Sequence, residues 1–442
     1  MSLYKSNARL LAVSIDGCVW DEASLVAGLS RALQHGPPDP SHLAARLLSR
    51  FPAAQSPPSR FQLAAFFQHD EALRQAWQTA SGVAGIRLSL DPNRMQPVSA
   101  GWLGASLPPL PDARALSAWL GVSLRELAWF ADQQGLQGRI LEPRLHHYRY
   151  RWLAKAAGGR RLLEIPKARL KTIQRQILRE LLNRVEPHVC THGFRRGRSN
   201  LSFVAPHVGK AVVLRIDLKD FFHSVPVARV GALFRSLGYP AGVAAALRGL
   251  CTHRVAPGLI GRGLEALPHV QRSRLVHEHL PQGAPTSPAL SNLCAWRLDA
   301  RLSGVARRFA LDYTRYADDL AFSGAPGLAR LAPFLEALVG AIAREEGFAV
   351  NHRKTRLGTQ AQRQQLAGIV VNRRPNLARS DFDRLKATLH NCARFGPDGQ
   401  NRDGISDFRS HLAGRVAYAA CVNADKGERL RRLFARIEWP PS

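Results

Sequence analysis

The chain has 442 residues, of which 62 are Lys or Arg and 33 are Asp or Glu, so its formal net charge is +29. Hydrophobic residues make up 45% and charged residues 21%, a composition that excludes wholesale disorder. Such a positive surplus repels itself unless a polyanion offsets it. Nucleic acid is the leading candidate, and an anionic membrane surface is the alternative.

Neither membrane insertion nor secretion is expected. No apolar run reaches the roughly 18–20 residues that a membrane helix needs, and Asp16, Asp21 and Glu22 interrupt the apolar stretch near the N-terminus. The six cysteines are scattered without a Cys-x-x-Cys pair, so we expect reduced core thiols. The pairs Cys251-x-His253 and His277-x-His279 offer a weaker, metal-binding alternative. We therefore expect a cytoplasmic protein.

Residues 1–110 are predicted to form a mainly helical N-terminal extension. An amphipathic helical pattern covers 61–79, and the role of the extension is not indicated by its residues. Proline-rich stretches that are typical of loops or boundaries lie at 35–42, 52–59 and 107–112.

Residues 111–144 are predicted to be a helical linker. Two helices within 113–135 are joined at Gly121-Val122-Ser123, with Ser123 as the N-cap of the second helix. Helix pairs of this kind are common packing units, so we do not expect this one to read DNA.

From residue 145 the pattern changes to strands and basic helices. A basic β-hairpin is predicted over 149–167 and a helix over 171–185. The β-branched run 211–218 predicts a half-buried strand. The segment 311–323 predicts two strands that meet at a tight turn around its Ala-Asp-Asp sequence, and the chain from about Asn376 is predicted to be helical.

Adjacent aspartates, Asp318 and Asp319, lie in this turn, and Asp217 ends the strand upstream. Neighbouring carboxylates repel each other, and partial burial increases the repulsion. Mg²⁺ relieves it, because this ion prefers oxygen ligands and leaves room for substrate phosphates. If the two strands pair, the carboxylates can share two ions and support an in-line phosphoryl transfer. A lone Asp-Asp pair is usually a solvated turn, but the hydrophobic strands around it favour the metal interpretation.

Five sequence blocks resemble the motifs of reverse transcriptases and follow the order of that family. They are 192–199 (HGFRRGRS), 215–225 (RIDLKDFFHSV), 280–288 (LPQGAPTSP), 316–319 (YADD) and 351–355 (NHRKT). One block would be weak, but five in order leave little room for chance. The region is most similar to bacterial retron-type enzymes, which usually carry Val-Thr-Gly where this chain has Leu366-Ala367-Gly368.

The resemblance implies an α+β fold of the right-hand polymerase type (fingers, palm and thumb) with an antiparallel palm sheet, in addition to the helical N-terminal extension. It places the start of the fingers at 111–144, the fingers and palm at 145–375 and a helical thumb at 376–442.

The resemblance also implies roles for individual residues. Asp217 and Asp318 would be metal ligands, Asp319 would support them, and Lys354 would donate a proton to the leaving pyrophosphate. Phe222 would exclude the 2′-hydroxyl of a ribonucleotide. We expect the incoming nucleotide and the template to contact Gln282 and Gly283. We expect the triphosphate to contact Arg160, Arg161 and Lys167. We expect the template backbone to contact Arg195, Arg196 and Arg198.

The implied function is RNA-directed DNA polymerisation with two Mg²⁺ ions. The substrates would be dNTPs and a structured noncoding RNA that serves as template and primer, and the product would be cDNA. The resemblance also implies a role in antiphage defence. An effector protein encoded nearby is a possible partner, and no membrane partner is expected. The alternatives are another bacterial reverse transcriptase class, such as a stand-alone antiphage polymerase or a group II intron-like enzyme, and an inactive RNA-binding scaffold.

Overall fold

The fold is that of a computed structural model. It describes residues 8, 11–12, 14–15, 20–33, 38–52, 58, 60–80, 107–132, 135–137, 139–140, 142–154, 158–255 and 267–439. The predictions for Asp16, Cys18 and parts of the proline-rich stretches 35–42 and 52–59 lie outside these residues. The chain divides into two compact units. The first comprises Met1–Pro97, Pro109–Leu116 and Gly238–Val243, and the second comprises Val98–Pro108, Ser117–Leu237 and Ala244–Ser442.

The N-terminal region is helical, as predicted. Its described helices are α2 (Glu22–Leu33), α3 (Pro40–Arg50), α4 (Arg60–His69) and α5 (Glu71–Ala80). They share a core of leucines with Phe67 and Trp77. The single pattern predicted over 61–79 is two helices, because Asp70 interrupts it: the Asp70 carboxylate accepts the Leu73 backbone N–H at 2.8 Å and pairs with Arg46 at 3.0 Å.

The linker helices and the hairpin follow the sequence prediction. Helices α6 (Ala113–Leu120) and α7 (Leu124–Phe130) meet at Ser123, which caps α7 in a reciprocal capping box with Glu126. The predicted hairpin is the antiparallel pair β1 (Tyr148–Ala154) and β2 (Arg160–Pro166). Helix α8 (Ala168–Glu180) and a 3₁₀ turn, η3 (Leu182–Arg184), cover the helix predicted next.

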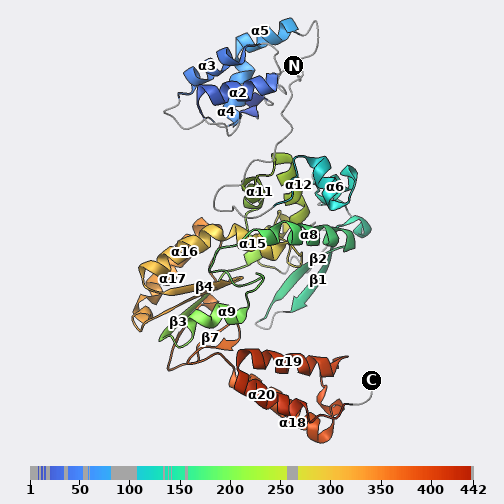
Figure 1. The fold of residues 1–442 in the computed structure, drawn as a ribbon, viewed down its shortest axis with the longest axis vertical. Helices are drawn as coiled ribbons and strands as arrows, with labels where there is room; N and C mark the ends of the chain where they lie inside the picture. The colour runs from blue at the N-terminus through green and yellow to red at the C-terminus, as the bar shows by residue number, and fades with distance from the viewer. Residues whose placement is uncertain are drawn as a thin grey trace. The chain divides into compact units, whose positions relative to one another are not determined.

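The second unit contains a four-stranded antiparallel sheet, of which Figure 1 labels the strands β3 and β4. It is built from β3 (Val212–Asp217), β4 (Asp312–Tyr316), β5 (Asp319–Gly324) and β6 (Arg356–Thr359), in the order β4-β5-β3-β6. The prediction of a half-buried strand was wrong for β3, since every residue of it except Arg215 is buried. The reason is that helices pack on the sheet: Phe203 joins Val213 in one core, and α17 also contacts β3.

Helices and short strands complete this unit. Those that bear on the site or on the sheet are α9 (Asn200–Val204), η4 (Ala205–His207), α10 (Phe221–Ser224), α11 (Val227–Ser236), α12 (Ala241–Cys251), α14 (His269–Val276), α15 (Ser287–Cys294), α16 (Trp296–Arg308), α17 (Leu328–Glu345) and η6 (His352–Lys354). A small second sheet contains β7 (Gln365–Leu366), β8 (Ile369–Val370) and β9 (Asn376–Leu377). The Ala367-Gly368 pair forms the turn between β7 and β8, with φ of 44° and 83°.

The C-terminal segment is helical, as predicted. Its helices are α18 (Arg379–Phe395), α19 (Phe408–Val422) and α20 (Ala424–Phe434), which Figure 1 shows in red and which share their own hydrophobic core. Within the described ranges, no helix has both the length and the apolarity to span a membrane. Cys190, Cys251, Cys294 and Cys392 are buried free thiols, as expected, but Cys421 is exposed.

Candidate active site

Strand register brings three carboxylates together. Asp217 at the end of β3 lies directly opposite Asp319 at the start of β5, and Asp318 lies in the turn beside it. The Leu218 backbone N–H donates to the Asp318 carbonyl at 2.9 Å, which extends the pairing past the last register position. The predicted pairing of these strands is therefore confirmed, and residues distant in sequence form one acidic cluster.

The three carboxylates have different partners. The Asp217 carboxylate is 3% exposed and accepts from Asn351 Nδ2 at 2.9 Å and from Lys354 Nζ at 3.1 Å. The Asp319 carboxylate is held by the Arg215 guanidinium, with N···O distances of 2.7 to 3.0 Å. In the part of the chain that the structure describes, no basic side chain forms an ion pair with Asp318.

Asp318 therefore carries the least compensated charge of the cluster. Burial, together with the neighbouring carboxylates of Asp319 and Asp217, raises the pKa of Asp318 from 3.8 to about 6. Burial also raises the pKa of Asp319, against the lowering effect of Arg215. The donor set consists of carboxylate oxygens with unbalanced negative charge, and this fits a divalent cation such as Mg²⁺.

A buried ion pair supports the turn from behind. Arg315 of β4 and Asp299 of α16 are both fully buried and joined by two bonds, at 2.8 and 2.6 Å. The Arg315 guanidinium also donates to the carbonyl of Ala317 in the turn, to Asn292 and to Thr191. The position of the turn is therefore fixed by a network that reaches into α15 and α16.

The turn also leaves no space behind Ala317. This residue has a φ of 55°, and the backbone of Gly193 passes so close that a Cβ on Gly193 would lie 2.7 Å from the Ala317 nitrogen. Gly193 belongs to the 192–199 block, so the absence of its side chain lets that block lie against the carboxylate turn.

Aromatic side chains lie next to this turn. Phe222 on α10 is half-buried, and its ring is 6.0 Å from that of Phe194, which in turn is 6.4 Å from that of Tyr316. Phe221 is instead a core residue, 4% exposed, that stacks on Phe348. The structure thus separates the two adjacent phenylalanines, with Phe222 on the side of Phe194 and Tyr316.

The Gln282-Gly283 turn packs against the β1–β2 hairpin. The backbone N–H of Glu164 in β2 donates to the Gln282 carbonyl at 2.9 Å. Gly283 has a φ of 135°, and a Cβ there would lie 2.7 Å from the Glu164 carbonyl oxygen. The close backbone approach that we expected at Gly283 therefore occurs to β2.

The side chains expected to bind phosphate differ in their solvent exposure and in their hydrogen-bond partners. Arg160 and Arg161 are exposed on β2. The expectation for Lys167 stays a prediction; its ammonium group donates to the carbonyls of Pro143 and Arg144, both at 2.9 Å. Of the three arginines expected at the template, Arg196 and Arg198 are exposed, whereas Arg195 is mostly buried and pairs with Glu186 at 3.1 Å.

Our sequence reasoning missed several residues that hold the site together. Arg215 precedes Asp217 by two positions in the strand, so alternation alone could have placed both on one face. Asp299 and Arg315 had no comparable signal, because a charged residue in a sequence is normally expected at the surface.

Removing the charge of Asp299 tests the role of the ion pair. Asp299→Asn leaves the Arg315 guanidinium buried without its counter-charge, and we expect the free energy of unfolding to fall by about 3–5 kcal/mol. In the control, Asp312→Asn, the lost partner is Lys210 in an exposed pair, and the expected fall is below about 1 kcal/mol. Urea unfolding measures both; equal losses in the two variants would contradict the network.

Removing the charge of Asp318 should stabilise the metal-free protein. The pKa of Asp318 is raised in the fold, so the fold favours the protonated form, and stability is lost as pH rises from about 4 through about 6. A pKa raised by about two units corresponds to about 3 kcal/mol of lost folding free energy. Asp318→Asn should recover this free energy at pH 8 in EDTA but not at pH 4. The control, Asp312→Asn, loses only the exposed pair with Lys210 and should give no gain. Urea unfolding across this pH range is the measurement, and a gain independent of pH would rule out the carboxylate charge as its cause.

Comparisons with known proteins agree with this geometry. The family described as reverse transcriptase (RNA-dependent DNA polymerase) matches residues 153–371. The retron Mx65 reverse transcriptase of Myxococcus xanthus is 41% identical over 319 residues, covering 72% of this chain and 70% of that protein. The retron Mx162 enzyme of the same organism is 34% identical over 343 residues, covering 74% and 67%, and the retron Ec86 enzyme of Escherichia coli is 28% identical over 294 residues, covering 66% and 81%.

A solved structure, that of the foamy viral protease-reverse transcriptase in complex with an RNA/DNA hybrid, aligns with a TM-score of 0.32 and 13% identity, over 66% of this chain and 33% of that one. The family match covers the strands, the turn and the blocks that carry the carboxylates. The chain therefore belongs to the bacterial retron-type reverse transcriptases and is an RNA-directed DNA polymerase.

Proposed function

We propose that this polymerase copies a structured noncoding RNA into cDNA from dNTPs, with two Mg²⁺ ions at the carboxylate cluster. The observation that carries the proposal is the convergence of Asp217, Asp318 and Asp319 at one strand register, where no basic side chain of the described residues forms an ion pair with Asp318. Reverse transcriptases generally use divalent metal ions.

Asp217 and Asp318 are the proposed metal ligands. Asp319 is already engaged by Arg215, which supports a secondary role for it. Bound there, the ions would stabilise charge on the attacking and leaving oxygens of the nucleotidyl transfer. Lys354 pairs with Asp217 and has a half-exposed side chain. Its ammonium group would donate a proton to the leaving pyrophosphate.

The nucleotide is proposed to lie between the carboxylates and the β1–β2 hairpin. Phe222 would pack under the sugar and exclude a 2′-hydroxyl, while Gln282 and Gly283 would border the base and the template. Arg160 and Arg161 are the proposed triphosphate contacts, since guanidinium groups match phosphate oxygens.

The RNA partner is proposed from charge and exposure. The chain carries a net charge of +29, and Arg196 and Arg198 are exposed in the block that lies against the carboxylate turn, with Arg195 beside them. Residues 376–442 would act as the thumb and grip the heteroduplex through its phosphates. A cognate noncoding RNA, a role in antiphage defence and an effector encoded nearby belong to the same proposal, and membership of the retron-type family supports them.

Single carboxylate-to-amide changes test the metal role. Asp217→Asn and Asp318→Asn should each reduce primer extension by at least about a hundredfold, because an amide oxygen holds a divalent cation less well than a carboxylate. RNA affinity, measured by filter binding, should stay the same or rise. The exposed Asp312→Asn variant is the control and should extend primers normally. Wild-type extension by either site variant would contradict the role of the cluster.

The proposed sugar gate predicts a change in substrate choice. Phe222→Ala opens space beside the sugar, so incorporation of rNTPs relative to dNTPs should rise by roughly tenfold or more. Phe334→Ala, which removes an exposed ring on α17, is the control for loss of a phenylalanine. Competition between dNTP and rNTP in single-nucleotide extension provides the measurement, and an unchanged ratio would place the gate at another residue.

A further inference from the structure

A second cluster of ligand-type side chains lies beside the nucleotide region and shares no residue with the carboxylate cluster. Glu164 of β2, His223 of α10 and His279 of the loop before Gln282 come within reach of one another, and their ligand atoms all lie within 4.8 Å. The side chains of Glu164 and His279 are 0% and 1% exposed, and that of His223 is 14% exposed. Three segments that are distant in sequence therefore meet at one buried point.

The orientation of His279 directs one of its ring nitrogens, Nε2, into the cluster. Its Nδ1 lies 2.7 Å from the backbone carbonyl of His277 and donates to it, which directs Nε2 toward the Glu164 carboxylate at 2.9 and 3.0 Å. A backbone carbonyl that accepts from the distal nitrogen is the usual way in which a metal-binding histidine is oriented.

Hydrogen bonding alone leaves the cluster incomplete. The Nε2 atom of His223 is buried, lies 3.4 Å from Glu164 Oε2 and has no hydrogen bond. A buried polar atom without a partner calls for an explanation, and an ion is one of the ordinary explanations.

The distances from the Glu164 carboxylate to the two imidazoles suit a zinc ion. Zinc bonds of about 2.0–2.1 Å in a tetrahedral arrangement put ligand atoms about 3.3 Å apart. The Glu164 oxygens lie 2.9 to 3.4 Å from the two imidazole nitrogens, and all three ligand atoms lie within 4.8 Å of one another. Two imidazoles and one carboxylate favour Zn²⁺ over Mg²⁺, which prefers oxygen ligands alone.

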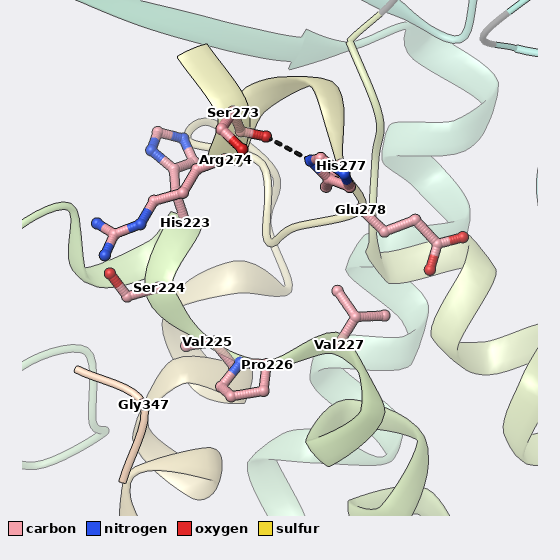
Figure 2. A pocket seen from close by; sticks show the side chains of 10 residues that line it. All are labelled: His223, Ser224, Val225, Pro226, Val227, Ser273, Arg274, His277, Glu278 and Gly347. Carbon is pink, nitrogen blue, oxygen red and sulfur yellow. Dashed lines mark hydrogen bonds between the residues drawn. The ribbon is translucent and has the colours of Figure 1, made fainter. Parts of the chain in front are cut away.

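A cavity lies beside the cluster on the side of His223. It has a volume of about 250 Å³ and is lined by His223, Arg274, His277 and Glu278, among other residues (Figure 2). Figure 2 shows His223 extending from α10 toward the segment that carries Ser273 and Arg274. The cavity therefore borders the partly exposed side chain of His223, whose Nε2 atom is buried.

We propose that Glu164, His223 and His279 bind a Zn²⁺ ion that fastens β2, α10 and the Gln282 loop to one another. His223 follows Phe222 directly, and Gln282 lies three positions after His279, so the ion would hold both elements of the nucleotide region in place. Cys251 and His277, which the sequence pairs suggested, are not part of this cluster, and His253 bonds to the Tyr150 hydroxyl at 2.7 Å instead.

The test is the metal content of the full-length chain. The protein is purified without a histidine tag, incubated with equimolar Zn²⁺ in excess Mg²⁺ and dialysed, and its zinc is measured by mass spectrometry. We expect about one equivalent in the wild type and less than a tenth in Glu164→Gln and in His223→Asn. The control, His277→Asn, removes a neighbouring exposed histidine and should keep the full equivalent.

Two further measurements separate this site from the carboxylates and from misfolding. Asp318→Asn should retain its zinc, and Co²⁺ should give in the wild type, but not in His223→Asn, the strong visible bands of four-coordinate cobalt. Circular dichroism checks the fold; if Glu164→Gln does not fold, His223→Asn carries the comparison. Less than a tenth of an equivalent in the wild type, or wild-type content in a folded His223→Asn, overturns the proposal and leaves a hydrogen-bonded Glu–His pair.

Discussion

The ion pair between Asp299 and Arg315 is the interaction on which the carboxylate turn depends. A buried guanidinium is costly unless its five N–H groups are all satisfied. Here they donate to Asp299 twice, to Asn292, to Thr191 and to the Ala317 carbonyl. Because one of these acceptors belongs to the turn itself, satisfying the buried cation and positioning the turn are the same requirement.

This support matters because the turn holds groups that repel one another. The Asp217 and Asp319 carboxylates are each matched by a cationic neighbour, Lys354 and Arg215, before any metal arrives. Among the described residues, no basic side chain forms an ion pair with Asp318, and burial, together with the carboxylates of Asp319 and Asp217, raises its pKa. The fold thus tolerates one carboxylate without an ion pair at the position that we propose as a metal ligand.

Much of this arrangement follows from local sequence patterns. The strands around Asp217 and Asp318, the β1–β2 hairpin and the Ser123 cap were predictable because alternation, turn residues and capping are encoded within a few residues. The grouping of the carboxylates also followed, once the strands were assumed to pair.

Features that depend on tertiary packing were not predictable in this way. Helices on the sheet bury β3 almost completely, although its alternation predicted partial exposure. The carbonyls that engage Lys167 lie more than twenty positions away in sequence. No spacing in the sequence signals the grouping of Glu164 with His223 and His279, because the three residues come from separate segments that meet only in the folded chain.

The missing side chain of Gly193 has a consequence for how such enzymes diverge. Its backbone and the Ala317 backbone occupy the same small space, so neither block can change shape without the other. If the YADD hairpin of a distant relative replaced the one in this chain without the segment around Gly193, the two segments in contact would come from different proteins and would not be matched in shape. In chimaeric enzymes of this type, both segments should therefore be exchanged together.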